Sequence, residues 1–287
     1  MKVFLVGATG YIGSVIAEGL LAAGHSVIGL SRSPEKDEAL RAQGVTPVRA
    51  DLKTPVTLET PAAASDGVIF AGTTNDGRLD MEAMAVLPRG KPLIYTSGVW
   101  VLGDTHGQVY DESSPLNPAP IVAWRPGAER LALGAGGVVI RPAVVYGRAG
   151  GLFSMLVNSA KESGAARYVG DGENRWPLVH VDDLAELYVL ALEKAKPGSL
   201  YMAADGPSYK VKEIAEAASY AADAAGNIKA VPLEQARQQY GPMADALVLD
   251  QQVSGDKAKR ELGWKPHGAS ALEELRYGSY ALPNVSP

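Results

Sequence analysis

Cysteine is absent from the 287 residues, which excludes disulfide bonds, thiolate metal ligands and a cysteine nucleophile. The four histidines lie far apart in the sequence, so the close spacing typical of a zinc site is missing and we expect no metal. No apolar run approaches the roughly 18 residues that span a bilayer, and the chain opens on a short strand-like segment. The sequence therefore predicts a cytoplasmic protein without a membrane partner.

An excess of positive charge is lacking as well. The chain has 27 lysines and arginines against 32 acidic residues, a formal net charge of −5. Proteins that bind nucleic acids usually have a concentrated positive charge. Because this chain is net negative, we expect no nucleic-acid partner. Hydrophobic residues at 46% and charged residues at 21% are ordinary values for a globular protein and allow a sizeable core.

Short apolar runs alternate with helical segments through the first half of the chain. Buried parallel strands have such unbroken apolar sequences, and helices connect them across both faces of the sheet. The pattern predicts a doubly wound, parallel α/β fold of the Rossmann type. The expected strands and helices of this half are Lys2–Val6, Tyr11–Ala23, Ser26–Leu30, Pro34–Gln43, Val45–Arg49, Gly67–Ala71, Lys91–Thr96 and Gly137–Arg141.

Three evenly spaced glycines follow the first apolar run and open a helical segment. In that context they permit a tight turn, close approach of the backbone to a pyrophosphate, and tight packing of helix on strand. The helix N-terminus then presents free N–H groups to the anion. A glycine turn used only for packing is the alternative. The residues expected to bind a dinucleotide here are Gly7, Thr9, Gly10, Tyr11, Ile12 and Gly13.

The end of the second expected strand favours NADP(H) over NAD(H). A carboxylate at this place normally binds the ribose 2′-hydroxyl of NAD, whereas an arginine accommodates the 2′-phosphate of NADP. Here the strand is followed by Arg32, with Ser31 and Ser33 beside it, and no carboxylate is present. A guanidinium and two hydroxyls suit a phosphate. The alternative is that Arg32 is a solvated loop residue.

Two further strand ends are expected to contact the adenosine part of the cofactor. Asp51, followed by Leu52, can accept a hydrogen bond from the adenine amino group, or its carboxylate can instead cap the next helix. Ala71, Gly72 and Thr73 close the fourth strand and let the backbone approach the ribose and pyrophosphate. An ordinary turn also uses glycine at such a place.

The alternation of strands and helices loosens after Gly147. We therefore expect residues 1–147 to form a dinucleotide-binding domain, to which later segments return. Residues 148–287 should form mainly a smaller α+β lobe that binds substrate. A ligand is expected between the two parts, over the carboxyl ends of the parallel strands.

These motifs together resemble the short-chain dehydrogenase/reductase superfamily, in its extended branch of nucleotide-sugar epimerases and dehydratases. The resemblance covers nearly the whole chain and implies a nicotinamide cofactor bound to a Rossmann-type domain, with Pro142 beside it. The segments that carry it, in the order the family has them, are Gly7–Gly13, Asp51-Leu52, Ile140–Gly147, Pro177–Ala185 and Lys257–Pro266.

The catalytic signature of that superfamily is not matched. Family members use a tyrosine as general acid or base and a lysine four residues later. With Glu129 as the landmark on the helix, Ile121 stands at the tyrosine position and Arg125 at the lysine position. Isoleucine transfers no proton, whereas Arg125 can still bind the ribose hydroxyls. The supporting hydroxyl position falls on Gly98, one residue after Ser97, so Ser97 is either that hydroxyl or a structural serine.

Candidates for the proton donor are Ser97, Tyr146, His180 and a bound water. Tyr146 and His180 can equally be packing residues that shape the substrate pocket. Trp100 and Trp124 flank the reaction region in sequence and can wall an apolar pocket, with core packing as the alternative. The long polar segment 103–119 is expected to cover part of the substrate site.

Three functions fit this sequence. The first is an atypical NADP(H)-dependent reductase or dehydrogenase that acts on a small carbonyl-type or imine substrate. The second is a non-catalytic NADP(H) sensor, which Ile121 favours, and the third is a nucleotide-sugar epimerase or dehydratase. The resemblance also implies a homodimer formed through helices that include the expected helix 121–133, although Pro126 and Gly127 weaken a helix interior.

Overall fold

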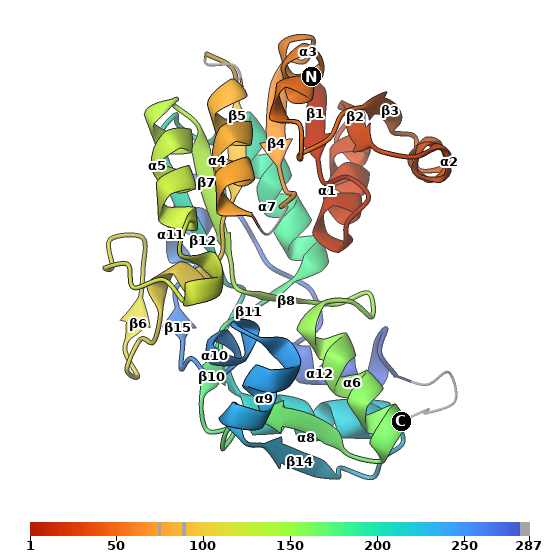
Figure 1. Ribbon diagram of the computed structural model, residues 1–287, viewed down its shortest axis with the longest axis vertical. Coiled ribbons are helices and arrows are strands. Elements are labelled where there is room, and N and C mark those ends of the chain that lie inside the picture. The colour runs from red at the N-terminus through yellow and green to blue at the C-terminus, as the bar shows by residue number, and fades with distance from the viewer. Residues whose placement is uncertain (74–75, 88–89, 282–287) are drawn as a thin grey trace.

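A parallel sheet of seven strands forms the centre of the larger part of the molecule in the computed structural model (Figure 1). The structure describes residues 1–73, 76–87 and 90–281. All neighbouring strands of the sheet run parallel. In spatial order the strands are β12 (Leu200–Ala203), β7 (Val138–Pro142), β5 (Leu93–Thr96), β4 (Gly67–Phe70), β1 (Lys2–Val6), β2 (Ser26–Ser31) and β3 (Thr46–Arg49).

The apolar sequence of β1 shows why this sheet is covered on both faces. Val3 and Leu5 belong to one hydrophobic cluster and Phe4 and Val6 to another, and all four are fully buried. Alternate residues of a strand point to opposite faces, so helices must cover both. One face is packed against α1 (Tyr11–Ala22), α2 (Pro34–Ala42), α7 (Val181–Lys194) and α11 (Asp256–Leu262), and the other against α3 (Glu59–Ala63), α4 (Gly77–Val86) and α5 (Arg125–Gly134).

The prediction of a doubly wound Rossmann-type sheet is confirmed, and three elements differ from the expectation. Strand β12, which lies at one edge of the sheet beside β7, was not expected, because its four apolar residues fall in the half assigned to the smaller lobe. Helix α4 was also missed. The expected helix 121–133 begins only at Arg125, because Pro126 fits the first turn of a helix but not its interior.

A smaller lobe lies below the sheet in Figure 1 and has its own hydrophobic core. Its strands form short pairs instead of one sheet, namely β8 (Val144–Tyr146) with β11 (Leu178–His180), β9 (Ala166–Val169) with β14 (Ile228–Val231), and β10 (Arg175–Trp176) with β13 (Tyr209–Lys210). Its helices are α6 (Gly151–Ser163), α8 (Val211–Ala221), α9 (Leu233–Tyr240), α10 (Met243–Leu247) and α12 (Ala271–Tyr277).

Short segments near the carboxyl ends of the central strands join the two parts. Single turns of 3-10 helix occur there at Val99–Leu102 and Pro120–Val122, whereas a third, Pro55–Leu58, packs against α3 and α4 within the larger part. A pair of two-residue strands, β6 (Val109–Tyr110) and β15 (Gln252–Val253), lies beside them. Among the described residues, no helix combines the length and the apolar character needed to cross a membrane.

Candidate cofactor and substrate site

The turn between β1 and α1 is shaped by its glycines to leave an open cradle. Gly7 has φ +94°, and a Cβ at this residue would lie 2.7 Å from the carbonyl oxygen of Ala71. A Cβ at Gly13 would collide with the carbonyl oxygen of Gly7. A Cβ at Gly10 would meet only that same oxygen, at 3.3 Å, and no side chain caps the helix that Gly10 precedes. The first N–H groups of α1 therefore face free space that suits a pyrophosphate.

A cavity of about 380 Å³ adjoins this turn on the side of β2 and β3. Three cationic side chains line it: Arg32, Lys36 and Lys53. None of them forms an ion pair with a described carboxylate. The cavity is therefore a basic recess next to the pyrophosphate cradle. Its remaining lining residues are Gly7, Thr9, Gly10, Leu30, Asp51, Leu52, Ala71, Gly72 and Thr73.

The two serines beside Arg32 lie outside this recess. The Ser31 side chain is fully buried, and its hydroxyl donates to the carbonyl oxygen of Ser33 at 3.0 Å and accepts from Arg49 at 3.3 Å. Ser33 caps α2 by accepting the backbone N–H of Lys36. Both hydroxyls therefore order the loop. In the basic recess, Lys36 and Lys53 stand beside Arg32 where the two serines were expected. Lys36 could have been found, because it lies in the first turn of the helix that begins two residues after Arg32.

The Asp51 carboxylate has a local partner. It accepts the backbone N–H of Lys53 at 3.0 Å, while the 3-10 turn that follows has Thr54 as its N-cap. Asp51 therefore orders the short loop that carries Lys53 and does not cap the next helix. It also lines the basic recess, where it stays a candidate for the adenine amino group.

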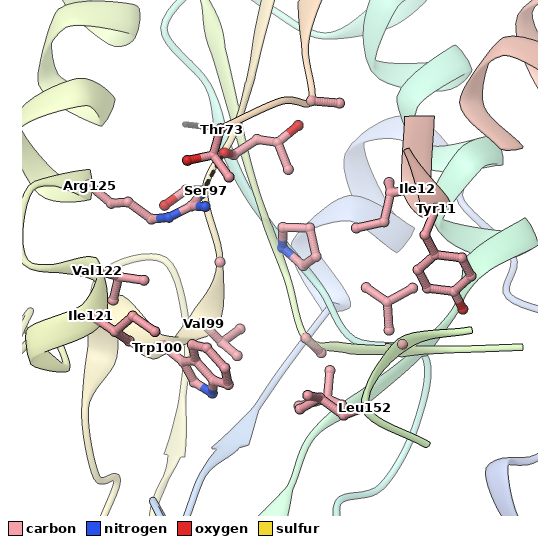
Figure 2. Close-up of a pocket in the computed structure, with 18 of the residues that line it drawn as sticks. Tyr11, Ile12, Thr73, Ser97, Val99, Trp100, Ile121, Val122, Arg125 and Leu152 are labelled. Carbon is pink, nitrogen blue, oxygen red and sulfur yellow. Dashed lines mark hydrogen bonds between the residues drawn. The ribbon is translucent and has the colours of Figure 1, made fainter. Parts of the chain in front are cut away.

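A second cavity, of about 430 Å³, meets the basic recess at residues 71–73 and extends toward the smaller lobe (Figure 2). Its walls come from the carboxyl ends of β4, β5 and β7, the first residues of α1, the segment before α5 and the start of α6. Two adjoining cavities of this kind can hold the two ends of a dinucleotide. The lining residues are Tyr11, Ile12, Ala71, Gly72, Thr73, Thr96, Ser97, Gly98, Val99, Trp100, Ile121, Val122, Trp124, Arg125, Pro142, Ala143, Val144, Val145, Gly151 and Leu152.

Ser97 contributes a buried hydroxyl to this second cavity. Its backbone N–H donates to the carbonyl oxygen of Ile140 at 2.8 Å, which fixes the end of β5 against β7. The side chain is only 6% exposed, and within the described part of the chain its Oγ has no hydrogen-bond partner. The neighbouring Thr96 hydroxyl is bonded to the Tyr188 hydroxyl at 2.6 Å. Ser97 is therefore the uncommitted hydroxyl of the cavity.

Ile121 and Arg125 both line the cavity, although they do not share a helix. Ile121 lies in the 3-10 turn Pro120–Val122 and has an apolar side chain. The cavity therefore has an apolar surface where short-chain dehydrogenases/reductases have a tyrosine hydroxyl. The Arg125 side chain extends toward Ser97 in Figure 2, and its Nη1 donates to the carbonyl oxygen of Thr96 at 2.8 Å. Its guanidinium carbon lies 5.9 Å from the centre of the Trp124 ring.

Tyr146 and His180 lie elsewhere, which the sequence did not foresee. The pairing of β8 with β11 sets them opposite each other, with ring centres 5.2 Å apart, and neither lines the cavity. The Tyr146 hydroxyl donates to Asp205 at 3.1 Å and to the carbonyl oxygen of Ala269 at 2.9 Å. Burial and the neighbouring Asp205 raise the Tyr146 pKa far above its ordinary value, so the hydroxyl keeps its proton. We leave both residues out of the proposed site.

Tyr11 connects the glycine turn to the smaller lobe. It lines the second cavity, and its hydroxyl donates to the carbonyl oxygen of Gly147 at 2.7 Å. The Tyr280 hydroxyl accepts from the backbone N–H of the same glycine at 2.8 Å. The position of the lobe is therefore tied to the first residue of α1.

The segment 103–119 does not lie over the cavity, and none of its residues lines it. It is held by the strand pair of β6 with β15 and by two bonds from the Gln251 side chain, to the carbonyl oxygens of Val99 and Gly103. Glu112 accepts the backbone N–H of Met202 at 2.8 Å, which attaches the segment to the edge strand β12. The expectation that it covers the substrate site finds no support in this packing, because its polar groups bond to neighbouring backbone.

Two family models match the chain. The model described as NAD(P)H-binding matches residues 7–90, and the model of the NAD dependent epimerase/dehydratase family matches residues 128–204. These ranges include the glycine turn, most of the basic recess and the end of β7. The chain therefore carries an NAD(P)-binding domain.

Similar proteins cover nearly all of the chain. An uncharacterized protein of Schizosaccharomyces pombe is 36% identical over 98% of this chain and 100% of its own length. A ketoreductase of Stigmatella aurantiaca that acts on a farnesyl dihydroquinoline oxide is 26% identical over 100% of this chain and 99% of its own. Among solved structures, the dTDP-glucose 4,6-dehydratase of Bacillus anthracis in complex with NAD superposes with a TM-score of 0.82. It shares 18% identity, over 97% of this chain and 95% of that one.

Proposed function

We propose that this chain, which belongs to the NAD-dependent epimerase/dehydratase family of the short-chain dehydrogenase/reductase superfamily, is an NADP(H)-dependent reductase or dehydrogenase of a small carbonyl or imine substrate. The observation that carries the proposal is the pair of adjoining cavities, one basic and the other largely apolar with one uncommitted buried hydroxyl. The reductase relative from Stigmatella aurantiaca supports the reaction class.

The choice of NADP(H) rests on the charges of the basic recess. A 2′-phosphate carries up to two negative charges, which Arg32, Lys36 and Lys53 can balance from three sides. With NAD(H) the three cations of the lining would lack this phosphate, and Asp51 is the single carboxylate among the described residues of the lining. Because a group of like charges is stabilised by an anion bound among them, we favour the phosphorylated cofactor.

Replacing Arg32 with alanine should weaken NADPH about tenfold to hundredfold, because a charge-assisted hydrogen bond contributes roughly 1.5–3 kcal/mol. The affinity for NADH should change less than about threefold. Calorimetric titration of both nucleotides measures the two effects. Arg41→Ala is the matched control, since Arg41 is exposed on the same side of the sheet in the last turn of α2. Equal losses for NADPH and NADH would remove the proposed specificity.

The second cavity offers what the reaction needs on the protein side. The residues that line it would hold the nicotinamide, whose reduced form would supply the hydride for the carbonyl carbon. Ser97 then places a hydroxyl beside the carbonyl oxygen, which gains a proton as the carbon–oxygen double bond becomes single. Ile121, Val122 and Leu152 provide apolar walls that exclude water from the reacting atoms.

Oxidation of NADPH in the presence of a panel of aldehydes, ketones and imines tests the proposal, with cofactor absorbance as the readout. Turnover of at least one compound supports a reductase. The second candidate function is a non-catalytic NADP(H) sensor. Ile121 favours it, because an isoleucine stands where the family has its proton-transferring tyrosine. Tight NADPH binding without turnover of any compound would therefore decide for the sensor.

Ser97→Ala should lower kcat about tenfold with little change in the dissociation constant of NADPH, because the variant loses one hydrogen bond to the substrate oxygen. Steady-state kinetics with the best substrate of the panel and calorimetry with NADPH measure the two quantities. Ser14→Ala serves as the control, since the Ser14 hydroxyl bonds to the backbone of its own helix. An unchanged kcat in Ser97→Ala would assign proton delivery to another group.

A further inference from the structure

We propose that the second cavity binds a carboxylate, so that the substrate is a short oxo acid whose carboxylate is held by Arg125 beside the reacting carbonyl. This inference rests on the proposed reductase function and names its substrate class. Two independent features of the cavity carry it, the unpaired charge of Arg125 and a set of hydrogen-bond donors that lack acceptors.

Among the described residues that line the cavity, Arg125 is the single charged one, and none of them balances its charge. The side chain is half-buried, and within the described residues it forms no ion pair. Glu129, one turn further along α5, is engaged with Arg141 instead. A charge that is partly removed from water is normally paired, and a guanidinium cannot escape by losing its proton. The missing partner is therefore an anion that enters the cavity.

The helix to which Arg125 belongs adds to this preference. Arg125 is the first residue of the ten-residue helix α5, its N-cap Trp124 makes no side-chain capping bond, and the first turn holds no acidic residue. A positive side chain at the positive end of a helix is unfavourable. An anion bound at this point interacts favourably with both the guanidinium and the helix.

Unpaired donors in the same wall form the second observation. Of the four buried side-chain atoms without a partner in the described part of the chain, three belong to the cavity lining: Ser97 Oγ, Trp124 Nε1 and Arg125 Nε. Tryptophan and arginine nitrogens only donate, and a buried donor without an acceptor costs about 1–3 kcal/mol. The three atoms lie buried in the cavity wall and lack acceptors, so a ligand with acceptor oxygens satisfies them once these side chains turn toward it.

The other polar side chains of the cavity are already engaged. The Tyr11 hydroxyl donates to Gly147, Thr96 is bonded to Tyr188, and Thr73 donates to Asp80. A neutral ketone presents a single oxygen, which suffices for one donor. The ribose and amide of a bound nicotinamide also offer oxygens to these donors, so the charge of Arg125 distinguishes the substrates: a carboxylate balances it and a neutral ketone does not.

The positions of Arg125 and Ser97 limit the distance between the two oxygen-bearing groups. Arg125 Nη1 lies 2.8 Å from the carbonyl oxygen of Thr96, which belongs to the peptide group that joins Thr96 to Ser97. Arg125 and Ser97 therefore lie near each other in the wall, which favours an acid whose carboxylate and carbonyl are not far apart. In the reduction the carbonyl carbon gains a hydride from NADPH, which becomes NADP⁺, and the oxygen gains a proton. The product is a hydroxy acid whose carboxylate is unchanged.

Binding of an unreactive anion tests the site without any turnover. In calorimetry of the NADP⁺-loaded protein, the dissociation constant of butanoate should be at least about tenfold lower than that of the isosteric butanamide. The amide loses a charged hydrogen bond. Arg125→Gln should abolish this preference, and Arg125→Lys should keep part of it. Arg130→Gln is the matched control, because Arg130 is exposed on the same helix and lies outside the cavity.

Turnover provides the second arm. Pyruvate, acetoacetate and levulinate set the carboxylate at increasing distances from the ketone, and each is compared with its methyl ester. We expect the acids to be reduced at least about tenfold more efficiently than the esters. Arg125→Gln should raise the KM of the acids much more than it lowers kcat, and should leave the KM of the esters nearly unchanged.

The outcomes separate this inference from the proposed function. Carboxylate binding that depends on Arg125 supports the site even if no compound is reduced, in which case the reductase proposal alone fails. Equal binding of butanoate and butanamide overturns the inference, as does more efficient reduction of the esters than of the acids. The reductase proposal is unaffected by either result. Loss of NADP⁺ affinity in Arg125→Gln, with an unchanged preference for acids, assigns Arg125 to the cofactor and also overturns it.

Discussion

Replacing Gly10 with valine is expected to abolish the binding of both NADPH and NADH. Gly10 has φ −89° and ψ 170°, a backbone conformation that valine adopts readily, so the fold should persist. The branched side chain, however, would fill the space in front of the first turn of α1, where the N–H groups await the pyrophosphate. The dissociation constant of either nucleotide should rise more than about hundredfold, because the diphosphate loses several backbone hydrogen bonds at once.

Calorimetry and circular dichroism check this expectation together. Gly19→Ala is the control, since Gly19 lies on the same helix, where a Cβ would make an ordinary contact at 3.5 Å with Val189. It should bind both nucleotides normally. If Gly10→Val keeps its affinity within a few fold, the pyrophosphate lies elsewhere. Gly13→Ala is less informative, because its Cβ would collide with the backbone of Gly7 and disturb the turn itself.

The Glu129→Ala variant should lose about 3–5 kcal/mol of unfolding free energy, since it breaks a buried ion pair and leaves one charge behind. Glu129 and Arg141 are 2% and 3% exposed and form two parallel hydrogen bonds of 2.9 and 2.7 Å. The pair joins α5 to β7 in the interior. With Glu129 removed, the Arg141 guanidinium stays buried without a counter-ion.

Urea-induced unfolding, followed by tryptophan fluorescence, measures the loss. Glu82→Ala is the comparison, because Glu82 forms an exposed ion pair with Arg78 on α4 and should change the stability by less than about 1 kcal/mol. The double variant Glu129→Leu with Arg141→Met should regain most of the stability, since no charge is left unpaired. A loss below about 1 kcal/mol in Glu129→Ala would mean that water reaches Arg141 in the variant.

The sequence was sufficient for features that are local in the chain. The glycine turn, β1 and α1 follow one another directly, so their periodicity and spacing predict the elements, and the place of the pyrophosphate stays a prediction from the same turn. Arg32 is found by the same logic, because it follows β2 at once. Lys53 was missed because it reaches the basic recess only through the loop that Asp51 orders.

Residues that meet through tertiary packing were harder to predict. The motif around Tyr146 was recognised from the sequence. The position of the Tyr146 side chain, however, depends on the pairing of β8 with β11, and the preceding strand β7 does not determine it. Arg125 was expected on one continuous helix with Ile121, whereas Pro126 starts a new helix and turns the arginine toward Thr96. That the Ser97 hydroxyl lacks a hydrogen-bond partner while the neighbouring Thr96 hydroxyl has one in Tyr188 depends on tertiary packing, which the sequence does not show.

Strand β12 has a consequence for how the chain is made. It pairs with β7 through Leu200–Ala203, and helix α7, which precedes it, covers one face of the same sheet. A ribosome must therefore deliver the residues as far as Ala203 before the sheet is complete. Until then β7 is an unpaired edge, the kind of surface on which nascent chains aggregate.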